Sequence, residues 1–261
     1  MKEAKDTWCI QIDVTNKCTR KCSNCTHLIT YADHWEMGLK NFEKALWSLK
    51  DWPKLVGLIG GDPMLHSHFD LLMEIMECYF PKEQRGLWTG DFQGKEKEMR
   101  DFFGYINYNP HNETVMHTPV LCASQDIVKD PVERRHFIDN CWLADKWSPS
   151  ITPKGVYRCE VMGSMDMALN LNLGLNLSLN WWARPLSHFE TQIDAFCNLC
   201  GVCLNLPARE DTDETDDVTL SNVGNYLHRK NRKQCIHESH SFNCKIGEDS
   251  QPYRYIERMK E

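Results

Sequence analysis

Short apolar runs alternate with amphipathic segments along the first half of the chain. The apolar runs predict strands near residues 8–14, 55–61, 85–90, 104–108 and 118–124. Between them, apolar residues recur at three- and four-residue intervals, which predicts helices over residues 41–49, 69–79, 95–103 and 132–140. Strands that alternate with helices favour an α/β fold, with βα units around a parallel sheet.

The second half of the chain has a different pattern. Short apolar runs on either side of Pro153-Lys154-Gly155 predict a tight β-hairpin, and residues 187–196 predict a short helix. Between them, residues 169–180 carry leucine at every odd position and a polar residue or glycine at every even one. This period of two favours one long edge strand, or two short strands folded at Gly174, although such biased repetition also permits a loop.

Residues 206–261 have the composition of a polar appendage. Six of the eight residues 210–217 are acidic, and such a run resists burial, so we expect a solvated linker here rather than a metal site. Further along, four side chains at short spacing offer a weaker alternative, a zinc site. They are Cys235, His237, His240 and Cys244.

Composition limits the class of protein. The chain has 261 residues, of which 41% are apolar and 26% charged, as in ordinary globular proteins. The first residues lack the apolar core of a signal peptide, and no stretch approaches the roughly 20 apolar residues that cross a bilayer. A net charge of -7 gives no basic surface for general nucleic-acid binding. We therefore expect a cytoplasmic protein that binds neither membranes nor nucleic acids in general.

Thirteen cysteines supply the candidate chemistry. In the reducing cytosol, cysteines serve as metal or cluster ligands more readily than as disulfides. Cys18, Cys22 and Cys25 directly follow the first predicted strand, and their Cys-x3-Cys-x2-Cys spacing suits three corners of one iron-sulfur cluster. Three ligands leave one iron open to a substrate. The alternative is a zinc knuckle, for which His27 is the local candidate for the fourth ligand.

A second segment belongs with this triplet. The predicted strand at residues 55–61 ends in Gly60-Gly61-Asp62-Pro63, about 35 residues after Cys25. Glycines at a strand end allow backbone groups to approach a ligand closely. Taken alone, an Asp-Pro before a helix is more often a turn and a cap.

Together these segments resemble the radical S-adenosylmethionine (SAM) enzymes. Residues 14–25, Val-Thr-Asn-Lys-Cys-Thr-Arg-Lys-Cys-Ser-Asn-Cys, are similar to the cysteine signature of that family, and Gly60 to Pro63 are similar to its Gly-Gly-Glu-Pro motif, with Asp62 in place of Glu. The resemblance implies a catalytic [4Fe-4S] cluster on the three cysteines, whose open iron binds SAM. An electron then cleaves SAM to methionine and a 5'-deoxyadenosyl radical, which takes a hydrogen atom from the substrate.

The resemblance also implies a fold and further contacts. The family fold is a partial TIM-like barrel with SAM at the carboxyl ends of its strands. Gly60, Gly61, Asp62 and Pro63 would contact SAM, and Asn24 stands where many members have an aromatic residue against the adenine.

Later cysteines resemble the SPASM and twitch extensions of radical SAM enzymes. In these extensions a cysteine before a hairpin, one on its second strand and a later Cys-x2-Cys pair hold an auxiliary [4Fe-4S] cluster. Cys141, Cys159, Cys197 and Cys200 match that order, and Cys203 could replace any of them. A structural zinc site is the alternative. We therefore divide the chain into a radical SAM core, a twitch-like domain and an appendage, at residues 1–140, 141–205 and 206–261.

The architecture is similar to that of the inosamine dehydrogenases, which oxidise a secondary alcohol. We therefore expect dehydrogenation of a small alcohol or sugar, with the auxiliary cluster accepting an electron and a flavodoxin- or ferredoxin-like protein as electron donor. Cys122, at a predicted strand end, is a candidate to return a hydrogen atom to a substrate radical, as a cysteine does in peptide epimerases, although a buried structural thiol is the simpler interpretation. Peptide modification is an alternative reaction, and a non-catalytic iron-sulfur or zinc module is an alternative class.

Overall fold

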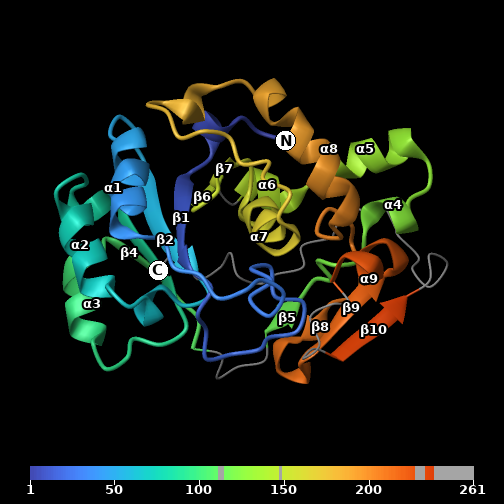
Figure 1. Ribbon diagram of the computed structural model, residues 1–261, viewed down its shortest axis with the longest axis horizontal. Coiled ribbons are helices and arrows are strands. Elements are labelled where there is room, and N and C mark those ends of the chain that lie inside the picture. The colour runs from blue at the N-terminus through green and yellow to red at the C-terminus, as the bar shows by residue number, and fades with distance from the viewer. Residues whose placement is uncertain (111–114, 147–148, 227–232, 238–261) are drawn as a thin grey trace.

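The computed structural model describes residues 1–110, 115–146, 149–226 and 233–237. Its main element is a six-stranded sheet in the order β4-β3-β2-β1-β6-β7 (Figure 1). The strands are β1 (Cys9–Thr15), β2 (Leu55–Gly60), β3 (Arg85–Thr89), β4 (Tyr105–Tyr108), β6 (Ser150–Thr152) and β7 (Gly155–Tyr157). All neighbouring pairs are parallel except the β6–β7 hairpin. The predicted α/β class, with a largely parallel sheet, is confirmed.

Helices cover one face of this sheet. They include α1 (Leu39–Ser48), α2 (Phe69–Glu77) and α3 (Glu96–Phe102), which follow β1, β2 and β3 in the chain (Figure 1). Ile12, Leu58 and Leu87 pack against them in the main hydrophobic core. With α5 (Pro131–Asp139), the four helices predicted in the first half of the chain are confirmed. None of the helices within the described ranges is long and apolar enough to cross a bilayer.

Aromatic rings cover part of the opposite face of the sheet, which we call the inner face. Trp88 lies over Gly57, where an added Cβ would come 2.2 Å from its ring. The ring of Trp8 meets those of Trp88 and Tyr105 at centroid distances of 6.0 and 5.2 Å. Gln11 and Asp13 of β1 alternate with its core residues and are buried.

The predicted hairpin extends the main sheet. β6 pairs in parallel with β1, Gln11 opposite Ser150, and β7 turns back at Gly155, whose φ of 128° favours glycine. The next helix, α7 (Glu160–Leu169), was not predicted from the sequence. It packs closely on β6, since a Cβ on Gly163 would come 2.8 Å from Ser150 Oγ. The later predicted helix forms as a short 3-10 turn at Leu186–Phe189 followed by α8 (Glu190–Phe196).

The leucine-rich segment is a loop, so the expectation of strands in it is wrong. Asn170 and Asn172 have left-handed φ values of 59° and 58°, which interrupt an extended chain. Only Leu175 makes a β-bridge, with Val156. Regular alternation was therefore not sufficient to specify a strand.

The expectation of a strand at residues 118–124 is also wrong. Leu121 forms one isolated bridge, with Val218, and the chain then enters the short helix α4 (Ser124–Ile127). The segment is buried, but Val120 accepts its hydrogen bond from Gly201 rather than from a strand beside β4. The apolar residues of this segment therefore reflect its burial and not pairing in a sheet.

The acidic segment is folded, which overturns the expectation of a solvated linker. Two small sheets form near it, an antiparallel pair of β5 (Met116–His117) with β8 (Arg209–Glu210) and a parallel pair of β9 (Thr215–Thr219) with β10 (Lys233–His237). Asp211, Asp216 and Asp217 are buried. Asn24 and Tyr31 donate to the side chain of Asp216, Asn24 donates to that of Asp217, and the N–H of Ser23 donates to the backbone O of Asp211.

The remaining short elements connect these parts. The helices are α6 (Trp142–Lys146) and α9 (Leu220–Tyr226). Further 3-10 turns lie at Ala4–Asp6, Pro63–Leu65, Lys82–Gln84, Trp181–Ala183, Cys197–Leu199 and Asp211–Asp213.

Candidate active site

The cysteine triplet lies in the loop that leaves the carboxyl end of β1. Cys18, Cys22 and Cys25 are all partly buried. Burial, followed by the charges of Cys25, Asp211 and Cys18, raises the pKa of the Cys22 thiol to about 12. Burial and the charge of Cys18 are among the causes that raise the pKa of Cys25 to about 11. The three thiols are therefore close enough to act on one another.

These thiols fit a metal cluster. Neighbouring thiolates repel one another in a partly buried site, and a bound cation removes that repulsion. Soft thiolate ligands select iron-sulfur clusters, copper(I) and zinc. The backbone N–H of Arg20 donates to Cys18 Sγ at 3.4 Å, the kind of hydrogen bond that stabilises a ligating sulfur.

His27 has another partner. Its Nδ1 lies 3.2 Å from Asp13 Oδ1 on β1. Burial lowers the pKa of His27, but the hydrogen bond and charge of Asp13 outweigh this and raise it. The imidazole is thus held by a carboxylate on the sheet.

Gly60 and Gly61 bring the end of β2 against the start of the cysteine loop. Gly61 N–H donates to Thr15 O at 2.8 Å, and Asp62 N–H donates to Lys17 O at 2.7 Å. A Cβ on Gly61 would lie 2.1 Å from Lys17 O. Only glycine allows this approach, so the pair fixes the direction in which the loop leaves the sheet.

Asp62 joins the carboxyl ends of β2 and β3. Its Oδ1 accepts from Thr89 Oγ1 at 2.8 Å and from Met64 N at 3.1 Å, and its Oδ2 accepts from Gly90 N at 3.2 Å. Burial raises the pKa of this carboxyl even though these donors oppose the change. The Met64 contact is the cap expected of an Asp-Pro sequence.

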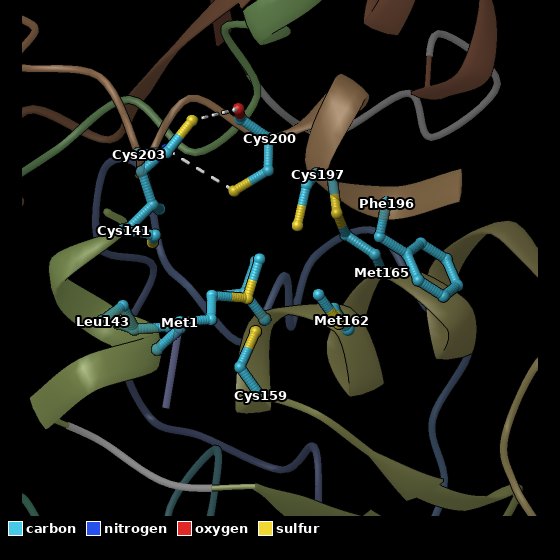
Figure 2. Close-up of a pocket in the computed structure, with 13 residues that line it drawn as sticks. Met1, Cys141, Leu143, Cys159, Met162, Met165, Phe196, Cys197, Cys200 and Cys203 are labelled. Carbon is cyan, nitrogen blue, oxygen red and sulfur yellow. Dashed lines mark hydrogen bonds between the residues drawn. The ribbon is translucent and has the colours of Figure 1, made fainter. Parts of the chain in front are cut away.

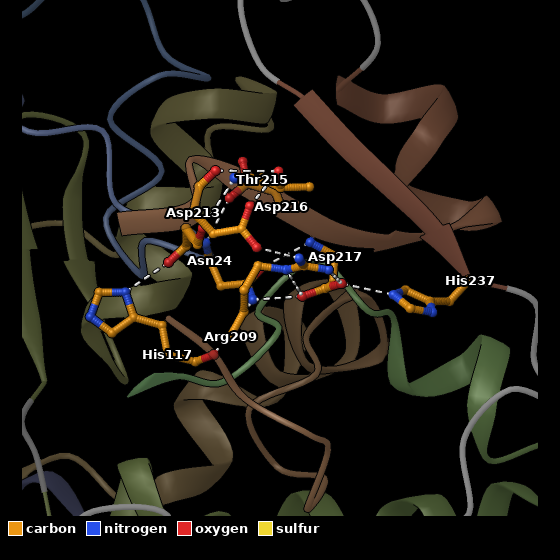
Figure 3. A network of polar contacts seen from close by, with 9 residues as sticks. Asn24, His117, Arg209, Asp213, Thr215, Asp216, Asp217 and His237 are labelled. Carbon is orange, nitrogen blue, oxygen red and sulfur yellow. Dashed lines mark hydrogen bonds and ion pairs between the residues drawn. The ribbon is translucent and has the colours of Figure 1, made fainter. Parts of the chain in front are cut away.

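Asn24, predicted to contact adenine, is held by β9 (Figure 3). Its Nδ2 donates to Asp217 Oδ2 at 2.9 Å, and its Oδ1 accepts from Asp217 N at 2.8 Å. Its own backbone N–H donates to Asp216 Oδ1 at 2.6 Å. The structure thus gives the Asn24 amide protein partners, and the adenine contact stays a prediction.

Five later cysteines line one apolar pocket (Figure 2). They are Cys141, Cys159, Cys197, Cys200 and Cys203. The walls between them come from α6, α7 and α8 and include Leu143, Met162 and Phe196, and Met1 also lines the pocket. Figure 2 shows the sulfurs of Cys159, Cys197 and Cys200 directed toward the same space.

Four of these thiols act strongly on one another. Burial, then the charge of Cys141, is among the causes that raise the pKa of Cys159 to about 12. Burial and the charges of neighbouring cysteines raise the pKa values of Cys197 and Cys200 well above the ordinary range. Such a set fits a cluster or zinc, because a cation would stabilise all four thiolates. Cys203 Sγ points instead toward Cys200 O, at 3.8 Å.

Cys122 is completely buried in a small apolar cluster with Val128, Phe137, Leu204 and Leu206. Burial raises the pKa of its thiol. This surrounding gives Cys122 a packing role, and its role as a hydrogen-atom donor stays a prediction.

Sequence reasoning missed a buried acid pair next to both cysteine sites. Glu160 follows Cys159 at the start of α7, and it acts electrostatically on His27 and Asp13. Burial raises its pKa to about 7, despite the opposing charge of His27. Asp13 Oδ2 and Glu160 Oε2 have no hydrogen-bond partner among the described residues. The charged Asp13 in a strand that is otherwise uncharged was the available signal.

Asp217, Cys235 and His237 are brought together on β9 and β10, with their ligand atoms within 4.8 Å of one another. Asp217 Oδ1, however, already accepts from Arg209 Nη2 at 2.7 Å and lies 2.8 Å from His237 Nε2. His240 and Cys244, the other predicted zinc ligands, lie outside the described residues.

No family model matches the chain, and no curated protein matches it. A crystal structure of BtrN in complex with AdoMet and 2-DOIA has 15% identity, over 74% of this chain and 88% of that chain, with a TM-score of 0.44. A structure of selenomethionine BtrN in an open conformation has 14% identity, over 79% of this chain and 97% of that chain, with a TM-score of 0.41. Structural similarity at these identities and TM-scores does not show the function of this chain.

Proposed function

We propose that this chain is a radical SAM enzyme, with a partial TIM-like barrel core. The observation that carries the proposal is the convergence of Cys18, Cys22 and Cys25 at the carboxyl end of β1, against the backbone of Gly60 and Gly61. The Nδ1 atom of the nearby His27 is bound to Asp13, so Nε2 is the ring nitrogen that this imidazole could offer to a metal. Three thiolates would hold a [4Fe-4S] cluster and leave one iron open.

When bound, that cluster supplies the electron that cleaves SAM to methionine and a 5'-deoxyadenosyl radical, which removes a hydrogen atom from the substrate. The chain's own residues place these groups. Gly60 and Gly61 let the end of β2 approach the start of the cysteine loop closely, and Asp62 holds the ends of β2 and β3 together. The electron donor would be a flavodoxin- or ferredoxin-like protein in the cytoplasm.

For the reaction, we propose oxidation of a small alcohol or sugar. Cys141, Cys159, Cys197 and Cys200, in a twitch-like arrangement, would hold a second [4Fe-4S] cluster, and four protein ligands restrict a cluster to electron transfer. Asp13 Oδ2 and Glu160 Oε2 are buried acceptors that hydroxyl groups of a polar substrate could satisfy. Both features suit the removal of a hydrogen atom followed by an electron.

Two measurements test the class. Two clusters predict about eight irons per chain, one predicts about four, and zinc without iron would support a binding module instead. The reconstituted protein, incubated anaerobically with SAM and dithionite, should form 5'-deoxyadenosine that mass spectrometry detects.

The variants for this assay are cysteine substitutions. Cys22→Ala should abolish the product, whereas Cys78→Ala, at an exposed cysteine that caps the end of α2, should retain it. A wild-type protein that holds its full iron content but forms no 5'-deoxyadenosine would contradict the proposal.

A further inference from the structure

The cysteine loop is bound to a segment nearly two hundred residues away. Asn24, between Cys22 and Cys25, contacts Asp216 and Asp217 of β9 at a sequence separation of 192 and 193 residues. Ser23 contributes as well, since its N–H donates to Asp211 O at 2.9 Å and its Oγ accepts from Thr215 N at 3.1 Å. Residues 211–217 therefore bind two neighbouring residues of the loop, Ser23 and Asn24.

Asn24 needs this support because of its backbone conformation. Its φ is 51°, in the left-handed region that residues other than glycine adopt rarely, asparagine being among the more tolerant. The conformation turns the chain between two of the three proposed ligands. The hydrogen bonds from Asp216 and Asp217 engage the backbone N–H, the side-chain Nδ2 and the side-chain Oδ1 of Asn24, so they select that conformation.

The two carboxylates are bound by different donors. Arg209 binds Asp217 through Nε at 3.0 Å and Nη2 at 2.7 Å. Asp216 accepts from the N–H of Asn24 and from the hydroxyl of Tyr31, the latter at 2.5 Å. Asp216 is 2% exposed and lies close enough to act electrostatically on Cys25.

We infer that Asp216 and Asp217 are positioning residues for the loop that carries Cys18, Cys22 and Cys25, and that the charge of Asp216 lowers the reduction potential of the cluster bound there. The charge part follows because net charge and hydrogen bonding near a cluster set its potential, and a nearby anion disfavours the reduced state. This inference rests on the proposed function for the cluster, but the positioning part concerns the protein alone.

The positioning part is tested in the metal-free protein by hydrogen exchange at the Asn24 amide. Asp216→Ala removes the acceptor, and we expect that amide to exchange about tenfold faster or more. Glu214→Gln changes an exposed acid of the same segment and should leave exchange as in the wild type. Unchanged exchange in Asp216→Ala would overturn the positioning role.

A second variant covers the case in which Asp216→Ala does not fold. Tyr31→Phe removes one donor to Asp216 and leaves the carboxylate in place. We expect a smaller increase in the exchange of the Asn24 amide, in the same direction. Exchange at the wild-type rate in this variant would count against the network.

The charge part is tested on the reconstituted protein by redox titration monitored with electron paramagnetic resonance. Asp216→Asn keeps the shape and removes the charge, so the potential of the SAM-binding cluster should become more positive, while Glu214→Gln should leave it unchanged. An unshifted potential in Asp216→Asn overturns the charge role. If the wild type binds no cluster at Cys18, Cys22 and Cys25, the proposed function fails, and the exchange experiment still decides the positioning role.

Discussion

The imidazole Nδ1 of His27 lies 3.2 Å from Asp13 Oδ1, a contact that joins the cysteine loop to the inner face of β1. His27 is two residues after Cys25, and Asp13 is two residues before the end of β1. A displacement of either side chain would therefore move the loop that carries the proposed cluster ligands.

The first prediction concerns that contact. In Asp13→Asn, the pKa of His27 should fall, because burial disfavours the imidazolium and the opposing charge is gone. An NMR titration of the His27 ring protons in metal-free protein measures it. Asp51→Asn, at an exposed acid, is the matched control. An unchanged His27 titration in Asp13→Asn would show that the carboxylate does not hold the ring.

The second prediction is a pH dependence from Glu160, whose pKa is raised from 4.5 to about 7. A carboxyl with a raised pKa binds its proton more tightly in the folded state, so its contribution to stability is fully present below pH 4.5. That contribution is lost as the pH rises to about 7, by on the order of 2–3 kcal/mol. Glu160→Gln should flatten this dependence in urea unfolding of metal-free, reduced protein. If wild type and variant lose stability in parallel over this range, Glu160 is not the responsible group.

The third prediction separates Cys203 from the other pocket cysteines. Because its sulfur points to Cys200 O, Cys203→Ser should keep the second cluster, whereas Cys197→Ser should lose about half of the total iron. Iron analysis and the visible absorption of the reconstituted variants provide the measurement. If Cys197→Ser retained all of its iron and Cys203→Ser lost iron, Cys203 and not Cys197 would be the ligand of the second cluster.

The fourth prediction concerns Gly61. A Cβ added at Gly61 would lie 2.1 Å from Lys17 O, so Gly61→Ala must push the cysteine loop away from β2. The substitution should destabilise the protein by about 1–3 kcal/mol. Gly38→Ala, where an added Cβ has open space, is the control. Chemical denaturation gives the stability, and iron content shows whether the loop still holds its metal. Equal stability of the two variants would refute the close approach.

Local patterns predicted the core of the fold well. Apolar runs identified β1, β2 and β3, which are buried along their whole length, and also the partly exposed β4, and helical spacing identified α1, α2, α3 and α5. The same reasoning placed a strand at residues 118–124, because burial by a loop and burial in a sheet leave the same apolar signature. The leucine-rich segment failed for the complementary reason, since alternation describes side chains and not the left-handed turns at Asn170 and Asn172.

The candidate site was only partly predictable. Cysteine spacing identified the residues that meet in the two clusters of thiols, because metal ligands leave a strong local pattern. The partners of Asn24 could not be found this way, since Asp216 and Asp217 lie far along the chain in a run whose composition indicates solvation. Composition does not record the distant Tyr31 and Asn24 donors that, with the nearby Arg209, stabilise these acids in a buried position.

The parallel pairing of β6 with β1 places β1 in the interior of the sheet. In a fragment ending at residue 140, β1 would be an exposed edge strand, and its unpaired N–H and C=O groups could pair with a strand of another molecule. Such a fragment should self-associate rather than persist as a monomer. The hairpin near the second cysteine group therefore also shields the first from aggregation, so the two parts of the chain depend on each other for solubility as well as for geometry.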